Sequence, residues 1–348
     1  MQAVVVLPGL AEVDGPAAVD DALFRRVSGV PLLVRVLATA ARSGVTSVLL
    51  VRPGQISERS IRRRLRTPLT ESLPVEVIAV DHAFDPTDPT DWLTLAPHLA
   101  SQFLWLPWNV VTLKRSLSAL VESGAHGDHG VGLGPVVALG APAVVVSDAV
   151  LTTHRGRLDE YVRDPALPRA VVPEPMGVAV TSDRTRREAE RLLVRGSGKP
   201  SDGIYSTFNR RLCRPAVRWL SNTPITANVV TLVGLAVTLV SGYWYAQGYW
   251  TAYVLGALLY FLSVLLDEVD GMLARTKFQE SPFGCWLETV TDYASYLFLW
   301  AGMSIGLSRQ FGTPIWLELG GLTLVMSVLI FVVLVRLRAI ATTPDRPE

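Results

Sequence analysis

Four carboxylates stand close together near the end of the most apolar part of this chain. Asp267 and Asp270 lie three residues apart, and Glu288 and Asp292 lie four residues apart. On an α-helix these spacings place each pair on one face, so two facing helices would bring all four side chains toward one point. Like charges held together repel each other. One or two divalent cations relieve that repulsion, and hard oxygen ligands suit Mg²⁺, Mn²⁺ or Ca²⁺.

The surroundings of these carboxylates make them unusual. No Asp, Glu, Lys or Arg occurs from Trp219 to Leu266. About 20 apolar residues cross a bilayer, so this run predicts two membrane spans, separated at Gln247-Gly248. Two further spans are expected at about 284–308 and 314–335. Ionisable residues are costly inside a membrane and mark functional sites, so the carboxylates are our first candidates for catalysis or binding.

The basic residues predict the orientation of the spans. They gather before the first span, between the second and third, and after the fourth. Positive loops favour the cytoplasm, which places the N-terminal domain, the 275–283 loop and the carboxylates at the cytoplasmic side. We therefore expect an integral protein of the cytoplasmic membrane whose active site faces the cytoplasm. The basic residues in these three groups are Arg210, Arg211, Arg214, Arg218, Arg275, Lys277, Arg336 and Arg338.

The carboxylates belong to a longer motif. Residues 267–292 resemble D-x2-D-G-x2-A-R-x8-G-x3-D-x3-D, the motif of the CDP-alcohol phosphatidyltransferase family. The third acidic position departs from the motif, because Glu288 stands there in place of Asp, which keeps the charge and lengthens the side chain by one methylene. The matching residues are Asp267, Asp270, Gly271, Ala274, Arg275, Gly284 and Asp292.

This resemblance implies a metal-dependent transferase. It would move a phosphoalcohol group, such as phosphatidyl, from a CDP-alcohol donor to an acceptor alcohol and release CMP. It also implies two Mg²⁺ or Mn²⁺ ions, and a general base at Asp292. The resemblance assigns metal binding to Asp267, Asp270, Glu288 and Asp292, and contact with the CDP moiety to Gly271, Ala274, Arg275 and Gly284.

The segment before the first span has two parts. Residues 196–204 are rich in Gly, Ser and Pro and predict a linker. Residues 205–222 predict an amphipathic helix lying at the cytoplasmic membrane interface. Arg210 and Arg211 on that helix are weak candidates for binding an acceptor phosphate. The junction resembles fusions of inositol-phosphate cytidylyltransferase with di-myo-inositol-phosphate-phosphate synthase, which suggests a polyol phosphate, such as inositol phosphate, as acceptor.

Residues 1–195 predict a separate α/β domain. Short apolar runs of strand length alternate with helical patterns, including a helix at 29–44 that ends at Gly44. This order favours a parallel sheet covered by helices, and it resembles the nucleotidyltransferase fold. The predicted strands lie near 3–9, 45–51, 75–80, 102–106 and 143–147.

This domain lacks the chemistry of the fold that it resembles. A nucleotidyltransferase opens with a glycine-rich basic loop whose amides bind a triphosphate. Here the loop after the first strand has no basic residue before Arg25, and Asn109 stands where a metal-binding Asp is expected. We therefore expect an inactive domain with a scaffold, docking or oligomerisation role. The acidic residues in or just after the loop are Glu12, Asp14, Asp20 and Asp21.

Two other function classes remain open. The chain could be a non-catalytic, membrane-anchored nucleotide-binding or scaffold protein derived from this family, or an ion transporter that uses the carboxylates, although we see no internal repeat.

We expect a transmembrane domain at 223–338, a cytoplasmic tail at 339–348 and no nucleic-acid partner. Family members usually have six spans and commonly dimerise, so a homodimer or a partner subunit fits the resemblance. Only 18% of the 348 residues are charged, and mean hydropathy is +0.34, which suits a membrane protein.

Overall fold

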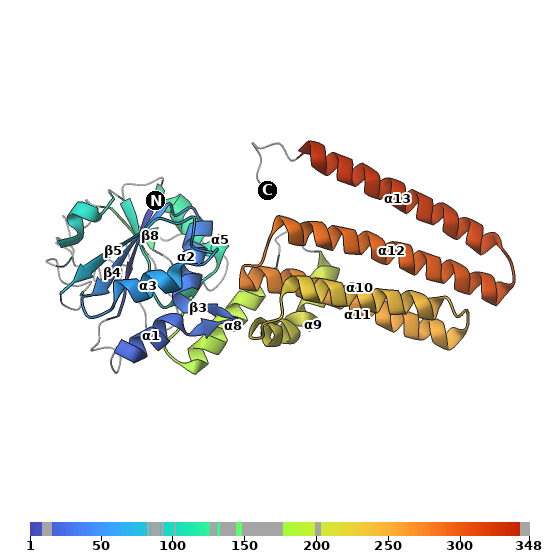
Figure 1. Ribbon diagram of the computed structural model, residues 1–348, viewed down its shortest axis with the longest axis horizontal. Helices are drawn as coiled ribbons and strands as arrows, with labels where there is room; N and C mark the ends of the chain where they lie inside the picture. The colour runs from blue at the N-terminus through green and yellow to red at the C-terminus, as the bar shows by residue number, and fades with distance from the viewer. Residues whose placement is uncertain are drawn as a thin grey trace. The chain divides into compact units, whose positions relative to one another are not determined.

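The chain folds into two compact units, Met1–Gly196 and Ser197–Glu348 (Figure 1). The first is an α/β unit and the second consists of long helices, so the predicted fold class is confirmed. The computed structural model describes all residues except 9–15, 82–83, 85–90, 92–93, 101, 126–130, 133–143, 148–176, 199–202 and 342–348.

The N-terminal unit is built on a six-stranded sheet with the order β5-β4-β1-β6-β9-β8. The first four of these strands are parallel, with Val4 of β1 paired to Leu49 of β4 and to Trp105 of β6. β9 pairs antiparallel with both β6 and β8, so the sheet is mixed where a fully parallel one was expected. The strands are β1 (Gln2–Val6), β4 (Ser47–Pro53), β5 (Val75–Val80), β6 (Gln102–Trp105), β8 (Val131–Gly132) and β9 (Val144–Ser147).

Continuous apolar runs explain the central strands. β1 reads QAVVV and β4 reads SVLLVRP, without the polar alternation of a strand that has one face in water. Their side chains form a buried core with Phe103 and Trp105. The surrounding helices are α1 (Pro16–Phe24), α2 (Leu32–Arg42), α3 (Glu58–Leu65), α5 (Lys114–Ala125) and α8 (Asp183–Gly196), with a 3-10 turn η2 (Ala96–His98).

Helix α2 begins later than the sequence pattern indicates. Residues 26–31 form a small hairpin of β2 (Arg26–Val27) and β3 (Val30–Pro31), whose turn places both Ser28 and Gly29 at positive φ. The buried guanidinium of Arg35 donates to the carbonyls of Val27 and Ser28 and so fastens the hairpin to α2. A second small sheet pairs β7 (Val110–Thr112) with β10 (Gly177–Ala179).

The helical unit begins with one shorter helix and continues with a set of long antiparallel ones (Figure 1). α10 packs against both α11 and α12, α12 also packs against α13, and α9 packs against α11. α10 is therefore the central helix of the unit. The helices are α9 (Ile204–Ser221), α10 (Ala227–Tyr245), α11 (Trp250–Lys277), α12 (Pro282–Phe311) and α13 (Ile315–Ala341).

Within the described residues, three helices are long and apolar enough to cross a membrane: Ala227–Tyr245, Trp250–Lys277 and Ile315–Leu337. The third predicted span corresponds to α12, which is 30 residues long but is not among these three. Its first half carries Glu288 and Asp292. Because α12 packs between α10 and α13, we keep its membrane crossing as a prediction.

Small residues allow α10 and α12 to cross closely. A Cβ added at Gly302 would lie 2.2 Å from the carbonyl oxygen of Gly242, and one at Gly306 would lie 2.0 Å from that of Tyr245. Neither distance is compatible with a side chain. Gly302 and Gly306 form a G-x-x-x-G pattern, which brings helix backbones together in membranes. The crossing fixes how α12 presents its acidic first half toward α10 and α11.

Candidate active site of the helical unit

A cavity of about 160 Å³ opens between α10, α11 and α12. Three of the four predicted carboxylates line it: Asp267 and Asp270 from α11, and Asp292 from α12. The remaining wall is largely polar and includes Thr231, Thr238, Ser263, Tyr260, Ser295 and Tyr296. None of the described lining residues is basic. A cavity lined by carboxylates and uncharged polar groups within apolar helices is suited to a cation or to a ligand that carries one.

Helix α11 supplies the first carboxylate pair. Its first 17 residues are uncharged and mostly apolar, and Asp267 follows directly, so the acids stand where the hydrophobic segment ends. Asp270 is buried, with 3% of its surface exposed, and Asp267 is exposed. The hydroxyl of Thr231 on α10 donates a hydrogen bond to Oδ2 of Asp270. Thr231 therefore fixes the orientation of a buried carboxylate.

Helix α12 supplies the second pair, and its two members differ in position. Asp292 is half-buried and lines the cavity. Glu288, one turn nearer the start of α12, is also half-buried but is not among the lining residues. Glu288 is therefore the one predicted acid that the cavity does not reach.

The donor set fits a hard divalent cation in its chemistry. Carboxylate and hydroxyl oxygens surround the cavity, which is the ligand type that Mg²⁺ and Mn²⁺ prefer. In the described residues no three Asp, Glu, His or Cys side chains already stand at metal-binding distances from a common point. The acids therefore share a cavity without forming a closed ligand shell, and metal binding stays a proposal for this chain.

The predicted CDP-contacting residues lie at the end of the bundle that holds the acids. A Cβ at Gly271 would lie 3.3 Å from Nη2 of Arg275, so the guanidinium of Arg275 covers this glycine. Arg275 also donates from Nε to the carbonyl of Ser197. Ala274 is half-buried on the same turn of α11.

Gly284 lies in the first turn of α12. Its N–H donates to the N-cap hydroxyl of Ser281, and a Cβ there would lie 3.4 Å from Oδ1 of Asn228 on α10. Gly284 therefore keeps the start of α12 close to the start of α10.

Arg210 points to a different partner from the predicted phosphate. Its Nε lies 2.8 Å from Oε2 of Glu268, and both side chains are largely buried. Ser206 donates to the other oxygen of Glu268. Arg211 is exposed, and neither arginine lines the cavity. The ion pair of Arg210 and Glu268 instead ties α9 to the segment of α11 that carries Asp267.

Sequence reasoning assigned no role to Thr231 or Glu268. Thr231 follows Asn228 by three residues, and nothing in this local sequence indicates a partner on α11. Glu268 lies beside Asp267, on a different helix face, so helical periodicity alone separates it from the cavity-lining acids.

The junction between α9 and α10 is also held from α11. The ammonium of Lys277 donates to the carbonyls of Thr223 and Ile225, each at 2.8 Å. The side chain of Gln279 accepts from the N–H of Ala227, the first residue of α10. These bonds hold the start of α10 against the end of α11, beside the acidic cavity.

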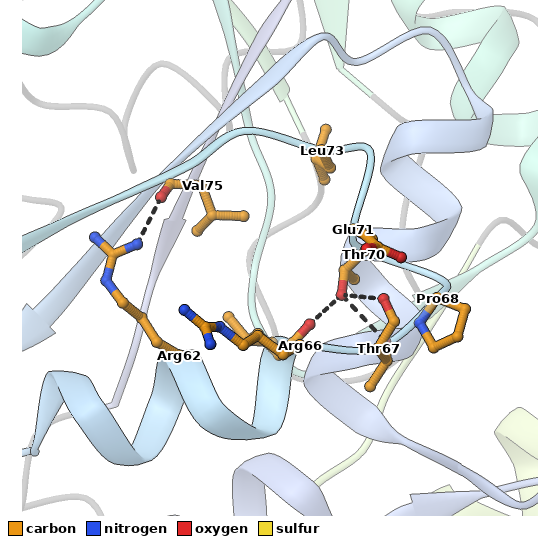
Figure 2. Close-up of a pocket in the computed structure, with 9 residues that line it drawn as sticks. Arg62, Arg66, Thr67, Pro68, Thr70, Glu71, Leu73 and Val75 are labelled. Carbon is orange, nitrogen blue, oxygen red and sulfur yellow. Dashed lines mark hydrogen bonds between the residues drawn. The ribbon is translucent and has the colours of Figure 1, made fainter.

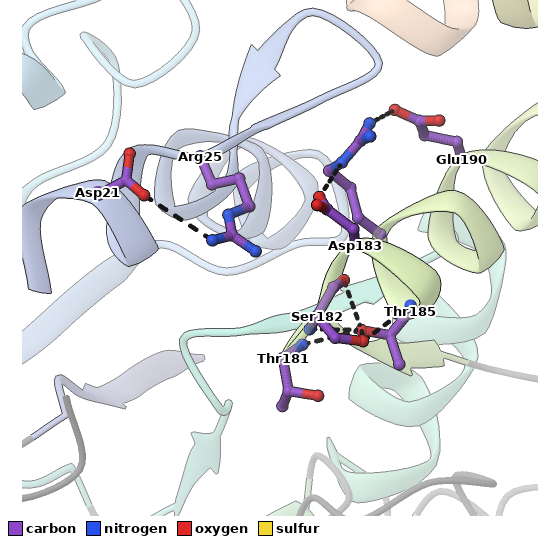
Figure 3. Close-up of polar contacts among 8 residues, drawn as sticks. Asp21, Arg25, Thr181, Ser182, Asp183, Thr185 and Glu190 are labelled. Carbon is purple, nitrogen blue, oxygen red and sulfur yellow. Dashed lines mark hydrogen bonds and ion pairs between the residues drawn. The ribbon is translucent and has the colours of Figure 1, made fainter. Parts of the chain in front are cut away.

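The N-terminal unit has a cavity of its own, of about 370 Å³. It is lined by Pro8, which follows β1, and by Asn109, which follows β6. β1 and β6 are adjacent parallel strands, so the cavity lies beyond their carboxyl ends. Ligands of open α/β sheets bind in this position. Arg25, the residue after α1, and Asp21 on α1 also line this cavity, and Figure 3 shows them directed toward each other in a loose ion pair at 3.8 Å. Glu12 and Asp14 of the predicted acidic loop lie outside the described residues.

The fold and the acidic cavity define a helical unit with three helices long and apolar enough to cross a membrane and with carboxylates gathered between them. Residues 224–345 match the CDP-alcohol phosphatidyltransferase family, so the helical unit carries a domain of this family, as its acidic motif predicted. The "Bifunctional IPC transferase and DIPP synthase" of Thermococcus kodakarensis is 31% identical over 150 residues, covering 42% of this chain and 32% of that protein.

Two further curated relatives match shorter stretches. The "Archaetidylinositol phosphate synthase" of Pyrococcus horikoshii is 30% identical over 87 residues, and the "Inner membrane protein YnbA" of Escherichia coli is 34% identical over 93. Each alignment covers 25% of this chain and 45% of the relative. The chain therefore spans less than half the length of the curated relatives that it matches.

Solved structures resemble about half of the chain. One is the homologue of Mycobacterium tuberculosis Rv0371c from Mycobacterium sp. strain JC1, with 14% identity and a TM-score of 0.42 over 55% of this chain and 97% of that one. Another is a putative glucose-1-phosphate thymidylyltransferase from Bacillus anthracis, with 8% identity and a TM-score of 0.43 over 55% and 95%. Scores this low carry no inference about the chemistry of the N-terminal unit.

Proposed function

We propose that this protein transfers a phosphoalcohol group from a CDP-alcohol to the hydroxyl group of an acceptor and releases CMP. One observation carries the proposal: the family match covers the helices that bring Asp267, Asp270 and Asp292 to one cavity. A scaffold protein has no evident need for three acids around a cavity inside apolar helices, because such groups are costly there.

The donor would be held where α11 and α12 approach each other. Gly271, Ala274 and Gly284 carry small or absent side chains, so a nucleotide can lie close to both helices. Arg275 is the nearby cation, and its guanidinium can pair with a phosphate oxygen when it leaves Gly271. In its present position it covers the glycine, which suggests that donor binding displaces this side chain.

The reaction needs one proton acceptor beside the acceptor hydroxyl. We assign this role to Asp292, which lines the cavity opposite the α11 acids. The acceptor oxygen forms a bond to the phosphorus that carries the alcohol, and the bond from this phosphorus to the oxygen bridging to CMP breaks. The acceptor proton passes to Asp292, and CMP leaves with the electron pair.

The acids would also hold the metal. We propose Asp267, Asp270, Glu288 and Asp292 as ligands of one or two Mg²⁺ or Mn²⁺ ions. Because Glu288 does not line the cavity, its side chain must move toward the cavity to bind an ion. Divalent ions held by these residues would supply charge neutralisation for the pyrophosphate and for the leaving CMP. Thr231 keeps one oxygen of Asp270 engaged and so leaves the other oriented for a ligand.

The names of two relatives suggest the acceptor. One is an archaetidylinositol phosphate synthase and another an IPC transferase and DIPP synthase. We therefore propose a polyol phosphate, such as inositol phosphate, as acceptor and a lipid CDP-alcohol as donor. The three membrane-crossing helices favour a lipid donor, since its acyl or ether chains can stay in the bilayer during transfer.

We further propose that the cavity opens toward the cytoplasm, because the basic residues of α9 and those in the last turn of α11, Arg275 and Lys277, favour that side. A cysteine placed at exposed Glu280, in a chain with Cys285→Ser, tests this orientation. A membrane-impermeant maleimide should label it in inverted membrane vesicles and spare it in intact cells. The reverse pattern would place the cavity on the other side.

The N-terminal unit is proposed to be non-catalytic. Asn109 cannot supply the carboxylate that a metal-dependent nucleotidyl transfer uses, and Arg25, which lines the same cavity, is paired with Asp21. Incubation of the protein with CTP and a panel of polyol phosphates should release no pyrophosphate. Steady pyrophosphate release would show an active cytidylyltransferase in this unit.

A transfer assay tests the central activity. Purified protein in detergent with Mn²⁺ is offered CDP-diacylglycerol or CDP-inositol, each with inositol phosphate, glycerol phosphate or inositol. The proposal expects CMP release that requires both metal and one of the acceptors. The alternative, a non-catalytic nucleotide-binding protein, expects stabilisation of the fold by CDP and Mn²⁺ with no CMP from any pair.

A further inference from the structure

Helix α3 carries the densest cationic patch of the N-terminal unit's described residues. It reads ERSIRRRL and is followed by Arg66, which gives five arginines within residues 59–66. Ile61 and Leu65 are the buried side chains of the helix, and all five arginines are exposed. Two aliphatic side chains thus hold the helix in the core, and the arginines lie on its solvent-exposed surface. The arginines are Arg59, Arg62, Arg63, Arg64 and Arg66.

Only part of this charge is neutralised within the protein. Arg62 pairs with Glu58 at 2.6 Å, and Arg64 pairs with Asp20 at 3.0 Å. Arg59, Arg63 and Arg66 have no acidic partner among the residues that the structure describes. These three exposed guanidinium groups are therefore the net positive charge of the patch.

A cavity lies beside the patch. It measures about 520 Å³ and is lined by Arg62 and Arg66, one helical turn apart, together with Thr67, Thr70 and Glu71. Figure 2 shows the guanidinium groups of Arg62 and Arg66 on the same side of this cavity, with Arg62 donating to the carbonyl of Val75. Two arginines and a hydroxyl around one cavity match the oxygens of a phosphate group. Glu71 is the one acid on the wall, and it is exposed.

We propose that the arginine face of α3 docks the N-terminal unit on the anionic surface of the bilayer in which the helical unit is embedded. The Arg62–Arg66 cavity takes one lipid phosphate, and Arg59 and Arg63 contact neighbouring headgroups. The lipid is the expected occupant because the chain carries its own membrane helices. Residues 197–203 are the only connection between α8 and α9, so the unit stays beside the bilayer at all times. Basic clusters next to membrane helices bind anionic leaflets.

The inference is tested on the full chain in lipid nanodiscs. A fluorophore is attached to a cysteine at Ser57, the exposed residue preceding α3, in a chain with Cys285→Ser. Quenching by lipids that carry a nitroxide on the headgroup reports contact of α3 with the surface. The discs contain either phosphatidylcholine alone or phosphatidylcholine with phosphatidylglycerol. We expect strong quenching in the anionic discs, weak quenching in the neutral ones, and loss of the difference at 0.5 M salt, roughly where screening becomes short-ranged.

Matched variants distinguish this surface from general attraction. Arg59→Gln, Arg63→Gln and Arg66→Gln together should lower the preference for anionic discs on the order of 100-fold, from three lost surface charges. The control is Arg184→Gln, Arg187→Gln and Arg191→Gln on α8, which removes the same charge from another exposed helix. Equal loss in both triple variants would overturn the proposal. Quenching of the same strength in neutral and anionic discs would also overturn it. So would loss of the quenching in anionic discs on addition of millimolar inorganic phosphate at constant ionic strength, which would make the occupant of the cavity a soluble anion.

Discussion

The guanidinium of Arg210 lies 2.8 Å from the carboxylate of Glu268, 58 residues further along the chain. Ser206 completes the contact from the same helix. Glu268 lies in α11 between the cavity-lining residues Asp267 and Asp270. The ion pair therefore fixes the acidic segment of α11 against α9, a helix whose opposite face exposes Ile204, Tyr205, Phe208 and Trp219.

Loss of either partner of this pair should destabilise the helical unit. The remaining charge would be largely buried and would lose the opposite charge that faces it, which costs about 3 kcal/mol. Arg210→Met and Glu268→Gln should each lower the midpoint of thermal unfolding in detergent by several degrees. The double variant should be more stable than the sum of the two single changes predicts. Fully additive changes would show that the contact is not a coupled pair.

Thr231 is expected to act through Asp270. Thr231→Val keeps the shape and removes the hydroxyl that orients this carboxylate. We expect the Mn²⁺ concentration for half-maximal activity to rise by about 10- to 100-fold, as for other lost partners of metal ligands. Thr231→Ser should restore most of the affinity.

Thr238→Val is the matched control for this change. Thr238 also lines the cavity, but its hydroxyl donates to Gly234 within its own helix. The Mn²⁺ dependence of this variant should match that of the parent protein. A similar shift in both variants would mean that cavity polarity, and not the bond to Asp270, sets the affinity.

The two cysteines should differ in reactivity. Burial, with the negative charge of Glu268 as a smaller cause, raises the pKa of the Cys213 thiol to about 11. At pH 8 its reactive thiolate is then on the order of 10⁻³ of the population. Cys285 is exposed. Mass spectrometry after treatment with a small maleimide should find Cys285 labelled and Cys213 spared, with Cys213 gaining label as the pH rises toward 11. Equal labelling at pH 8 would contradict the packing of α9 on α11.

Close contact between α10 and α12 should make Gly302 intolerant of substitution. Gly302→Ala places a methyl group where the carbonyl of Gly242 stands, so the helices must separate. We expect a lower unfolding midpoint and weaker activity, because α12 carries Asp292. Gly321→Ala on α13 meets no atom within 4 Å and is the control. It should be neutral or stabilising by about 1 kcal/mol from helix propensity.

The sequence predicted the elements better than their partners. The i, i+3 spacing of Asp267 and Asp270 correctly placed both on one cavity, because helix geometry alone decides which residues share a face. Glu288 shares a face with Asp292, yet it lies one turn away from the cavity. Whether both acids reach the cavity depends on where α12 crosses α10, and the crossing is set by backbone contact at Gly302.

Other differences have the same origin. The pairing of Arg210 with Glu268 joins two helices that are distant in sequence, and no local pattern distinguishes a buried ion pair from a phosphate site. The direction of β9 was also hidden, since an apolar run such as V-V-V-S reads the same in a parallel or an antiparallel pair. The expected helix at 29–44 begins only at Leu32, because the preceding residues form a hairpin whose turn is at Ser28 and Gly29.

The most direct test of the account is CMP release with Asp292→Asn beside the parent protein. Both are assayed in detergent with CDP-diacylglycerol, inositol phosphate and a Mn²⁺ series, after equal thermal stability has been confirmed. The account predicts metal-dependent CMP release by the parent and a loss of at least about 100-fold in the variant, the usual contribution of a general base. Release at the parental rate by Asp292→Asn would contradict the assigned chemistry of this cavity.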